Sequence, residues 1–307
     1  MVPSFNQGRF LKRTLASLVR EARENDLEVI VQDAHSTDDT ASVLDLFRDH
    51  EFMRIYVERD SGQSAALARG FARATGDIVG WLNSDDVLCV GALQAVRDTF
   101  ESNPGCDLVY GDAVFIDEND RIINAYPTAP LTLHNLRHRC VVSQPSVFMT
   151  RQSYEQCGGV RAELCYCMDY DLWTRLLLGG APVAQVDRIL SATRIHSDTK
   201  TSNGGLPFIQ EIIDMQYTHW GSPSTIWRVY ERTRSAPLTG VSNKMVKFLL
   251  AGVAQCGATP RLILDATRSL TERLMANMNG RRLLAERGLK GVVLSSETVV
   301  EPDFTPD

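Results

Sequence analysis

Short apolar runs alternate with amphipathic stretches through the first hundred residues of the chain. The runs Leu27–Val31, Met53–Val57 and Ile78–Leu82 have the length and composition of buried strands. Between them, Asn6 is a plausible helix cap, and the residues from Ser36 onward resemble a capping box. Strand–helix alternation with short connections predicts an α/β fold built on a mostly parallel, doubly wound sheet.

Polar residues stand at the ends of the predicted strands. They are Ser4 and Asn6, Asp33, Asp60, and the adjacent pair Asp85 and Asp86. Each group alone is compatible with a solvated loop or a helix cap. However, parallel strands place their carboxyl ends on one side of the sheet, where α/β proteins bind ligands. Carboxylate oxygens at that edge suit Mg²⁺ or Mn²⁺ carrying a diphosphate.

The second half of the chain changes from mixed to helical patterning. We expect a strand over Leu108–Ile116, a hairpin turn at Glu118–Asp120, a helix over Tyr170–Leu178 and a strand over Val183–Ile195. Further helices are predicted at 207–220, 223–234, 242–256 and 260–287. The expected organisation is an α/β domain over 1–205, a helical region over 206–290 and a flexible acidic tail over 291–307.

Composition restricts the partners of the chain. The formal net charge is −6, so no basic nucleic-acid-binding footprint is visible, and an anionic nucleotide would need local cations or a metal ion. The seven cysteines form no CxxC pair and are expected to be reduced thiols. Since the longest apolar patch, Val246–Ala254, is too short to cross a bilayer, we expect a cytoplasmic protein. Peripheral contact with the inner face of the membrane stays open.

Six motifs follow one another along the chain: Pro3-Ser4-Phe5-Asn6-Gln7, Asp33-Ala34-His35-Ser36-Thr37-Asp38, Asp60-Ser61-Gly62-Gln63, Leu82-Asn83-Ser84-Asp85-Asp86, Met168-Asp169-Tyr170-Asp171-Leu172-Trp173 and Arg194-Ile195-His196. Together they resemble glycosyltransferase family 2, the inverting transferases with a Rossmann-like GT-A fold. The resemblance covers roughly residues 1–201. It implies that 1–205 is a GT-A catalytic domain with a C-terminal helical extension.

The resemblance also implies a reaction. Family members move a sugar from a nucleotide-diphosphate donor, usually linked to UDP or dTDP, to a hydroxyl group of a saccharide or lipid-linked acceptor. By analogy, Asp86 is the direct ligand of Mn²⁺ or Mg²⁺ and Asp85 contacts the donor ribose or sugar. His196 often completes the metal shell, although a packing histidine is an equal alternative. Lys200 is expected to offset charge on the β-phosphate, with a solvated loop lysine as the alternative.

The same analogy assigns the nucleotide pocket. Asp33 matches the residue that hydrogen-bonds the uracil or thymine ring, and the Pro3-Ser4 backbone and Asn6 would line the same pocket. Asp60 matches a second carboxylate that contacts base or ribose. Gln63 would lie near the ribose.

Asp169 matches the catalytic base that takes the proton of the acceptor hydroxyl. It is expected at the start of a helix, where the helix dipole favours the carboxylate form. The alternative is that Asp169 only caps the helix. Asp171, two residues on, would face elsewhere and act structurally.

Three features depart from the family pattern. The first strand is expected to be very short, Ala65 and Ala68 stand where many relatives carry Asp and Asn, and Met168 replaces an acidic residue. The leading interpretation is a metal-dependent inverting glycosyltransferase. A nucleotidyltransferase is less favoured, because Pro3-Ser4-Phe5-Asn6 is no glycine- and arginine-rich triphosphate loop.

Two further alternatives concern activity and the helical third. A catalytically silent nucleotide-sugar-binding or scaffold protein of a polysaccharide pathway stays open. The helical segment 226–234 is expected to pack on the catalytic domain or form a homodimer face, or else to present a basic surface to a membrane.

Overall fold

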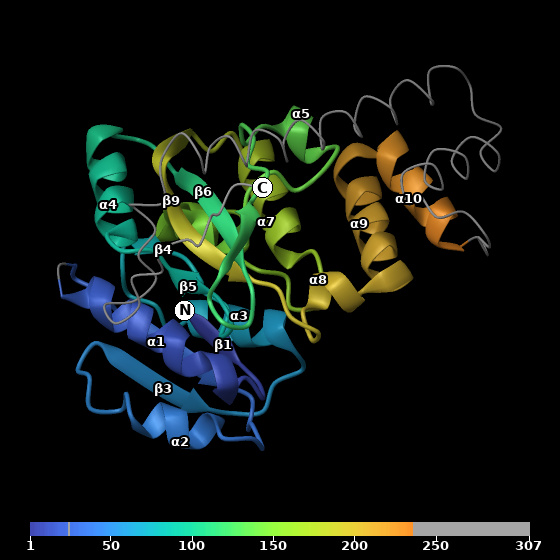
Figure 1. Cartoon of the computed structure of the whole chain (residues 1–307). Helices are drawn as coiled ribbons and strands as arrows, with labels where there is room; N and C mark the ends of the chain where they lie inside the picture. Colours follow the sequence, from blue (N-terminus) through green and yellow to red (C-terminus); the bar gives the residue numbers. More distant parts are fainter. Residues whose placement is uncertain (24, 236–307) are drawn as a thin grey trace, which may run out of the picture.

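The computed structural model describes residues 1–23 and 25–235 (Figure 1). The strands are β1 (Val2–Ser4), β2 (Val29–Asp33), β3 (Met53–Val57), β4 (Ile78–Val79), β5 (Val87–Leu88), β6 (Leu108–Ile116), β7 (Ile122–Ala125), β8 (Val147–Thr150) and β9 (Val183–Arg194). The helices are α1 (Gly8–Ala22), α2 (Thr40–Asp45), α3 (Gln63–Phe71), α4 (Ala92–Ser102), α5 (Leu133–Leu136), α6 (Arg151–Gln156), α7 (Met168–Leu178), α8 (Lys200–Asn203), α9 (Gly205–Trp220) and α10 (Thr225–Ser235), with a 3₁₀ turn η1 (Gln144–Ser146). The helices expected at 242–256 and 260–287, and the tail at 291–307, lie outside the described residues.

The first sheet is parallel and carries the predicted polar edge. Its strand order is β1-β2-β3, and the register aligns Ser4 with Asp33 and Asp33 with Val57. Helix α3 packs against β1 and β2, while α1 packs against α2 and β5. The carboxyl ends of the three strands therefore meet at one edge, as the sequence predicted for this half.

The second sheet is mixed. Its order is β4-β8-β6-β9-β5, with β7 paired to the outer part of β6. Only the central pair β6–β9 is parallel among its described pairings, and the expected hairpin β6–β7 is antiparallel. The α/β class is confirmed, and the parallel pairing is shared between the two sheets rather than continuous across one.

The strand expected over 78–82 is shorter than predicted. Strand β4 ends at Val79, because residues 80–82 leave β8 and run beside the start of β1. The backbone N–H of Leu82 donates to the carbonyl of Met1 at 2.9 Å, and Met1 nitrogen donates to Gly80 at 3.1 Å. These bonds connect the two sheets just before the acidic loop.

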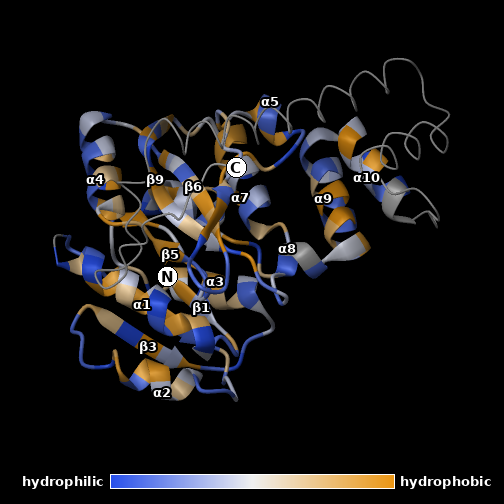
Figure 2. Cartoon of the chain, in the orientation of Figure 1, coloured by the Kyte–Doolittle hydropathy of each residue, from blue (hydrophilic) through white to orange (hydrophobic). Residues whose placement is uncertain are grey.

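Two large apolar clusters fill the interior (Figure 2). One lies between the first sheet and helices α1, α2 and α4, and includes Leu11, Leu15 and Val31. The other surrounds α7, where Trp173 stacks on Trp81 with 5.5 Å between ring centroids. Helices of both halves thus bury their apolar faces against strands, which holds the polar edge in a fixed place.

Two predicted helix starts are wrong. Helix α1 begins at Gly8 with Gln7 as its N-cap residue, and α2 begins at Thr40 with Asp39 as its N-cap residue. Asn6 instead adopts a left-handed φ of 52° and accepts a hydrogen bond from Thr37 at 2.8 Å. The Ser36 hydroxyl donates to Asp33 at 2.6 Å. Both side chains therefore join loops rather than cap helices.

The last two described helices pack on the α/β part of the chain. Ile212 on α9 and Trp227 on α10 belong to the cluster around α7, and Ile226 and Val229 are also buried. The apolar side of α10 therefore packs against the interior of the protein. The domain boundary at 205/206 stays a prediction. Within residues 1–23 and 25–235, no helix has both the length and the apolar character needed to cross a membrane.

Candidate active site

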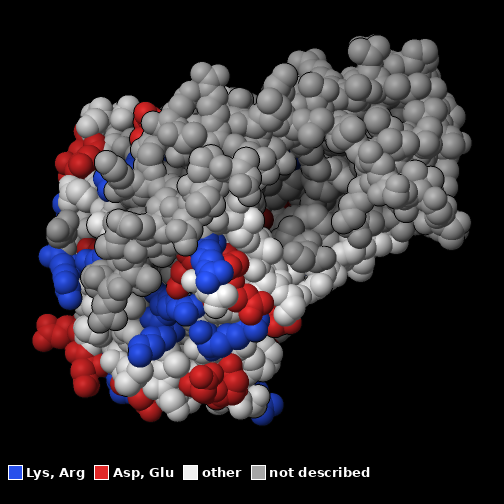
Figure 3. Space-filling view, viewed as in Figure 1, with Lys and Arg blue, Asp and Glu red and all other residues white. Residues whose placement is uncertain are grey.

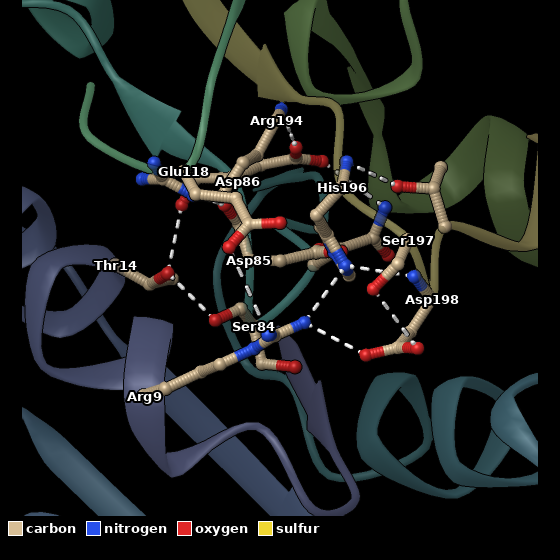
Figure 4. A network of polar contacts seen from close by, with 12 residues as sticks. Arg9, Thr14, Ser84, Asp85, Asp86, Glu118, Arg194, His196, Ser197 and Asp198 are labelled. Carbon is tan, nitrogen blue, oxygen red and sulfur yellow. Dashed lines mark hydrogen bonds and ion pairs between the residues drawn. The ribbon is translucent and has the colours of Figure 1, made fainter.

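The acidic loop between β4 and β5 is fixed on helix α1 (Figure 4). The Thr14 hydroxyl lies 2.9 Å from the carbonyl oxygen of Ser84 and 2.8 Å from that of Asp86. Arg194, at the end of β9, donates from Nε to the carbonyl of Asp85 at 2.8 Å. The loop backbone is thus held from both sides, which gives the two carboxylates defined directions.

Asp86 points into the protein. It is 2% exposed, its Oδ1 accepts the backbone N–H of Arg194 at 2.9 Å, and its Oδ2 accepts the amide of Asn83 at 3.2 Å. Burial, together with the neighbouring charge of Asp85, raises the pKa of Asp86 well above its ordinary value. This arrangement anchors the end of β9 to the loop and favours Asp85, rather than Asp86, as the outward-facing ligand.

Asp85 faces His196. Their Oδ2 and Nε2 atoms are 3.0 Å apart, and the Asp85 side chain keeps 20% of its surface exposed. His196 Nδ1 lies 3.2 Å from the backbone nitrogen of Asp198 and 3.0 Å from the Arg9 guanidinium. Since both of these groups can only donate, the ring hydrogen lies on Nε2 and is donated to Asp85.

The Asp85–His196 pair is hydrogen-bonded as it stands, and the two side chains would act as adjacent ligands of a cation once the ring hydrogen moves from Nε2 to Nδ1. Two neighbouring ligands of an octahedral ion with bonds of about 2.1 Å stand about 3 Å apart. Oxygen and imidazole donors suit Mn²⁺ or Mg²⁺, which commonly take the rest of their shell from water and phosphate. No cluster of three or more His, Cys, Asp or Glu arranged for a metal occurs among the described residues. The pair therefore fits a cation that shares its shell with a diphosphate.

Cations line the face in front of this loop. Figure 3 shows Lys and Arg side chains gathered over α1, with acidic side chains beside them. Arg9 donates to the Asp198 carboxylate at 2.8 Å, and Arg13 lies 3.1 Å from the Asp120 carboxylate. Both arginines are paired with carboxylates, so that positive and negative charge alternate on this face.

The residues expected to line the base pocket stand at the ends of β1 and β2. Pro3 and Ser4 are buried in β1. Asp33 is 3% exposed, and its oxygens accept the backbone N–H of Ser36 at 2.9 Å and its hydroxyl. Phe5, which the sequence analysis did not single out, is 58% exposed beside them. Its position directly after the predicted first strand is the sequence feature that could have marked Phe5 as a candidate site residue.

Gln63 of α3 adjoins the acidic loop, and Asp60 stands in the turn that precedes α3. The Gln63 amide donates to Asn83 at 2.8 Å, and Asp60 accepts the N–H of Gly62 at 2.9 Å. Lys200 donates to the carbonyl of Cys165 at 3.3 Å. A cavity of about 230 Å³ lies at this point, lined by Cys165, Tyr166, Asp198, Lys200, Asn203 and Gly204.

Asp169 and Asp171 stand on one helix in opposite environments. Burial raises the pKa of Asp169 to about 6, against the hydrogen bond that its carboxylate accepts from Tyr170. The backbone N–H groups at the helix start act to lower this pKa, as expected, but burial outweighs them. Asp171 is fully buried; burial acts to raise its pKa, but the hydrogen bond from His219 and the charge of Arg175 hold it below its ordinary value. Asp171 is thus held ionised by its partners, whereas the raised pKa of Asp169 lies closer to neutral pH.

The predicted residues thus fall into three groups. Asp85, Asp86 and His196 form one network. Asn6 and Asp33 meet through the 36–37 turn, and Gln63 reaches the acidic loop through Asn83. Asp169 stands apart on α7, shortly after Cys165, whose carbonyl oxygen accepts a hydrogen bond from Lys200.

Comparison with known proteins places this arrangement in a family. Residues 1–158 match the family described as Glycosyl transferase family 2. A UDP-Gal:alpha-D-GlcNAc-diphosphoundecaprenol beta-1,3-galactosyltransferase of Escherichia coli is 24% identical over 68% of this chain and 77% of that protein. A PGL/p-HBAD biosynthesis glycosyltransferase of Mycobacterium bovis is 28% identical over 50% of this chain and 61% of that protein. For chondroitin synthase of Escherichia coli, a match at 23% identity spans 64% of this chain but only 29% of the relative.

Solved structures share the fold. S. aureus TarS 1-349 in complex with UDP-GlcNAc aligns with a TM-score of 0.61 and 14% identity, covering 94% of this chain and 90% of the other. The mannosyltransferase PcManGT from Pyrobaculum calidifontis, in complex with GDP-Man and Mn²⁺, aligns with a TM-score of 0.56 and 17% identity, covering 94% and 85%. The family match and these GT-A neighbours confirm the expectation from the six motifs. The chain belongs to glycosyl transferase family 2 and is a glycosyltransferase.

Proposed function

We propose that this glycosyltransferase is metal-dependent and inverting. It moves a sugar from a UDP- or dTDP-linked donor to a hydroxyl group of a saccharide or lipid-linked acceptor. The observation that carries the proposal is the Asp85–His196 pair, whose 3.0 Å separation equals that of two neighbouring ligands of a cation. The separate, proton-exchanging Asp169 supplies the second requirement of the reaction.

In the proposed reaction, Asp169 accepts the proton of the acceptor hydroxyl. The acceptor oxygen forms a bond to the anomeric carbon while the bond from that carbon to the diphosphate oxygen breaks. The proton ends on Asp169, and the electron pair of the broken bond leaves with the nucleoside diphosphate. A single displacement of this kind inverts the anomeric configuration.

The negative charge on the leaving diphosphate must also be neutralised. A bound Mn²⁺ or Mg²⁺ would act as a Lewis acid toward the diphosphate, with Asp85 and His196 as its protein ligands. This proposal revises the ligand role expected for Asp86, which instead holds the end of β9 against the loop. Lys200 stands beside the cavity as a further cation for phosphate.

The relatives support the choice of donor and acceptor classes. The Escherichia coli relative is named for a UDP-galactose donor and a diphosphoundecaprenol-linked acceptor, and TarS was solved with UDP-GlcNAc. The archaeal neighbour was solved with Mn²⁺ and GDP-Man. A panel of uridine, thymidine and guanosine diphosphates is therefore the appropriate set of probes.

The test is a thermal-shift panel of these nucleotides with and without Mn²⁺. A ligand that binds only the folded state raises the melting temperature by mass action. We expect UDP or dTDP to stabilise the wild type only when Mn²⁺ is present, and the Asp85→Ala variant to lose this effect. Asp214→Asn removes an exposed carboxylate of α9 and is the matched control. Equal stabilisation of Asp85→Ala would contradict the ligand assignment.

A further inference from the structure

The segment just before α7 is held by side chains from three other elements. Ser64 of α3 donates to the carbonyl of Leu164, and Lys200 of α8 donates to that of Cys165. Glu211 of α9 accepts hydrogen bonds from the backbone N–H groups of this segment. The segment leads directly into Asp169, the second residue of α7.

Glu211 makes three of these bonds with one carboxylate. Its Oε2 accepts the N–H of Cys165 at 2.8 Å, and its Oε1 accepts those of Tyr166 at 2.6 Å and Cys167 at 2.7 Å. Cys167 is the N-cap residue of α7. Successive backbone N–H groups that converge in this way form an anion-binding concavity, and Glu211 occupies it from within the chain.

We propose that Glu211 is a positioning residue for the catalytic base. From α9 it fixes the turn that opens α7, and thereby sets where the Asp169 carboxylate stands. Glu211 lies beyond residues 1–158, which match the family, and beyond the motifs that signalled the reaction. The inference rests on the proposed role of Asp169 as base.

Glu211 also acts on Asp169 through its charge. Burial is the main cause of the raised pKa of Asp169, and the negative charge of Glu211 raises it further. The other titratable groups that face Asp169 are Cys140, Cys167 and Tyr126; burial raises the pKa of each, so that all three are neutral near pH 6. Arg139 faces Cys140 and Tyr126 in turn.

The first arm of the test compares Glu211→Gln with Glu211→Asp in sugar transfer. Glutamine keeps the length of the side chain but loses its charge and turns an amide toward the turn. We expect kcat to fall about 10- to 100-fold, because misplaced groups lose near-attack geometry. The acid limb of the pH profile should also move to lower pH. Aspartate keeps the charge but is shorter, so that kcat should fall while the acid limb stays in place.

Asp214→Asn, one turn further along α9, is the matched control and should keep both kcat and the pH profile. The proposal is overturned if Glu211→Gln keeps its kcat, or if its acid limb stays where the wild type has it. A loss of melting temperature without either change would make Glu211 an ordinary structural residue.

The second arm needs no activity. A carboxyl group whose pKa is raised on folding contributes stability below its unfolded pKa and loses it as the pH rises through about 6. The difference in melting temperature between wild type and Asp169→Asn should therefore change between about pH 4, the ordinary pKa of an aspartate, and about pH 6, its pKa in the folded protein. In the Glu211→Gln background this change should end at lower pH. An unchanged window overturns the proposal even if no sugar donor is ever found, which separates its failure from that of the proposed function.

Discussion

Two aspartates on α7 show how environment rather than sequence decides a residue's role. Asp171 faces Arg175 at 2.8 Å and His219 at 2.7 Å, whereas Asp169 has only a local backbone donor for its carboxylate. Full charge compensation keeps Asp171 ionised and inert. Partial compensation leaves Asp169 able to take up a proton near neutral pH.

Asp169→Asn should lower kcat/KM by about 100-fold or more, the usual contribution of a general base. The wild-type profile of kcat/KM should fall as the pH drops below about 6, because only the ionised carboxylate accepts a proton. Steady-state kinetics between pH 4.5 and 8, roughly centred on that value, test both points. A flat wild-type profile, or a variant that keeps its rate, would rule out Asp169 as the base.

Arg9→Gln should strengthen Mn²⁺ binding by about fivefold, equivalent to removing roughly 1 kcal/mol of like-charge repulsion. Arg9 lies 3.0 Å from His196 Nδ1 and thereby keeps the ring hydrogen on the nitrogen that faces Asp85. Titration of Mn²⁺, followed by the electron paramagnetic resonance signal of the free ion, measures the effect.

Arg13→Gln is the matched control for Arg9, because Arg13 lies on the same helix but pairs with Asp120. It should bind Mn²⁺ like the wild type. Weaker binding by Arg9→Gln would mean that Arg9 supports the cation site instead of competing with it.

At this scale the sequence located the acidic pair but not the direction of each carboxylate. Asp86 turns inward because its Oδ1 accepts the backbone N–H of Arg194, 108 residues further along the chain. Asp85 is left to face His196. Adjacent carboxylates on a loop look equivalent in sequence, and only a distant strand end distinguishes them.

At the scale of elements, strong periodicity was enough to predict strands and the helix of the base. Strands β3 and β6 have the predicted bounds, and α7 begins two residues before the prediction. The prediction was less accurate where side chains serve tertiary contacts, as at Asn6 and Ser36. It also missed the mixed pairing of the second sheet, because β4 pairs with β8, which is some seventy residues further along the chain.

Truncating Trp227 on α10 tests whether the C-terminal helices stabilise the catalytic part. Trp227 is 7% exposed and packs on Tyr230 and Phe208, with ring centroids 5.5 and 6.4 Å away. Trp227→Ala should lower the free energy of unfolding by about 3 to 5 kcal/mol, as for other buried aromatic truncations. Urea denaturation followed by circular dichroism measures this loss.

Arg228→Ala, on the exposed side of α10, should change the same free energy by no more than about 0.5 kcal/mol. If Trp227→Ala were equally mild, α10 would not share a cooperative core with α7, and the boundary at 205/206 would separate two independent units.

At the scale of the whole molecule, the acidic loop is held by both sheets and by helix α1. Met1 and Leu82 connect the sheets, Thr14 holds the loop on α1, and Arg194 ties it to β9. The donor edge and the turn before Asp169 are further joined through the stretch that carries His196, Lys200 and Glu211.

The position of Glu211 has a consequence for exchanging parts between relatives. A hybrid enzyme joined at residue 205 would take the turn at 165–167 from one parent and its carboxylate partner from the other. The two surfaces would then meet without having been selected together. A junction placed after α9, at Gly221 with its left-handed φ of 70°, keeps the turn, Lys200 and Glu211 in one parental piece. In this chain, a junction after α9 therefore keeps the bonds of Glu211 intact, although it divides the contact of Trp227 with Phe208 between the two parents.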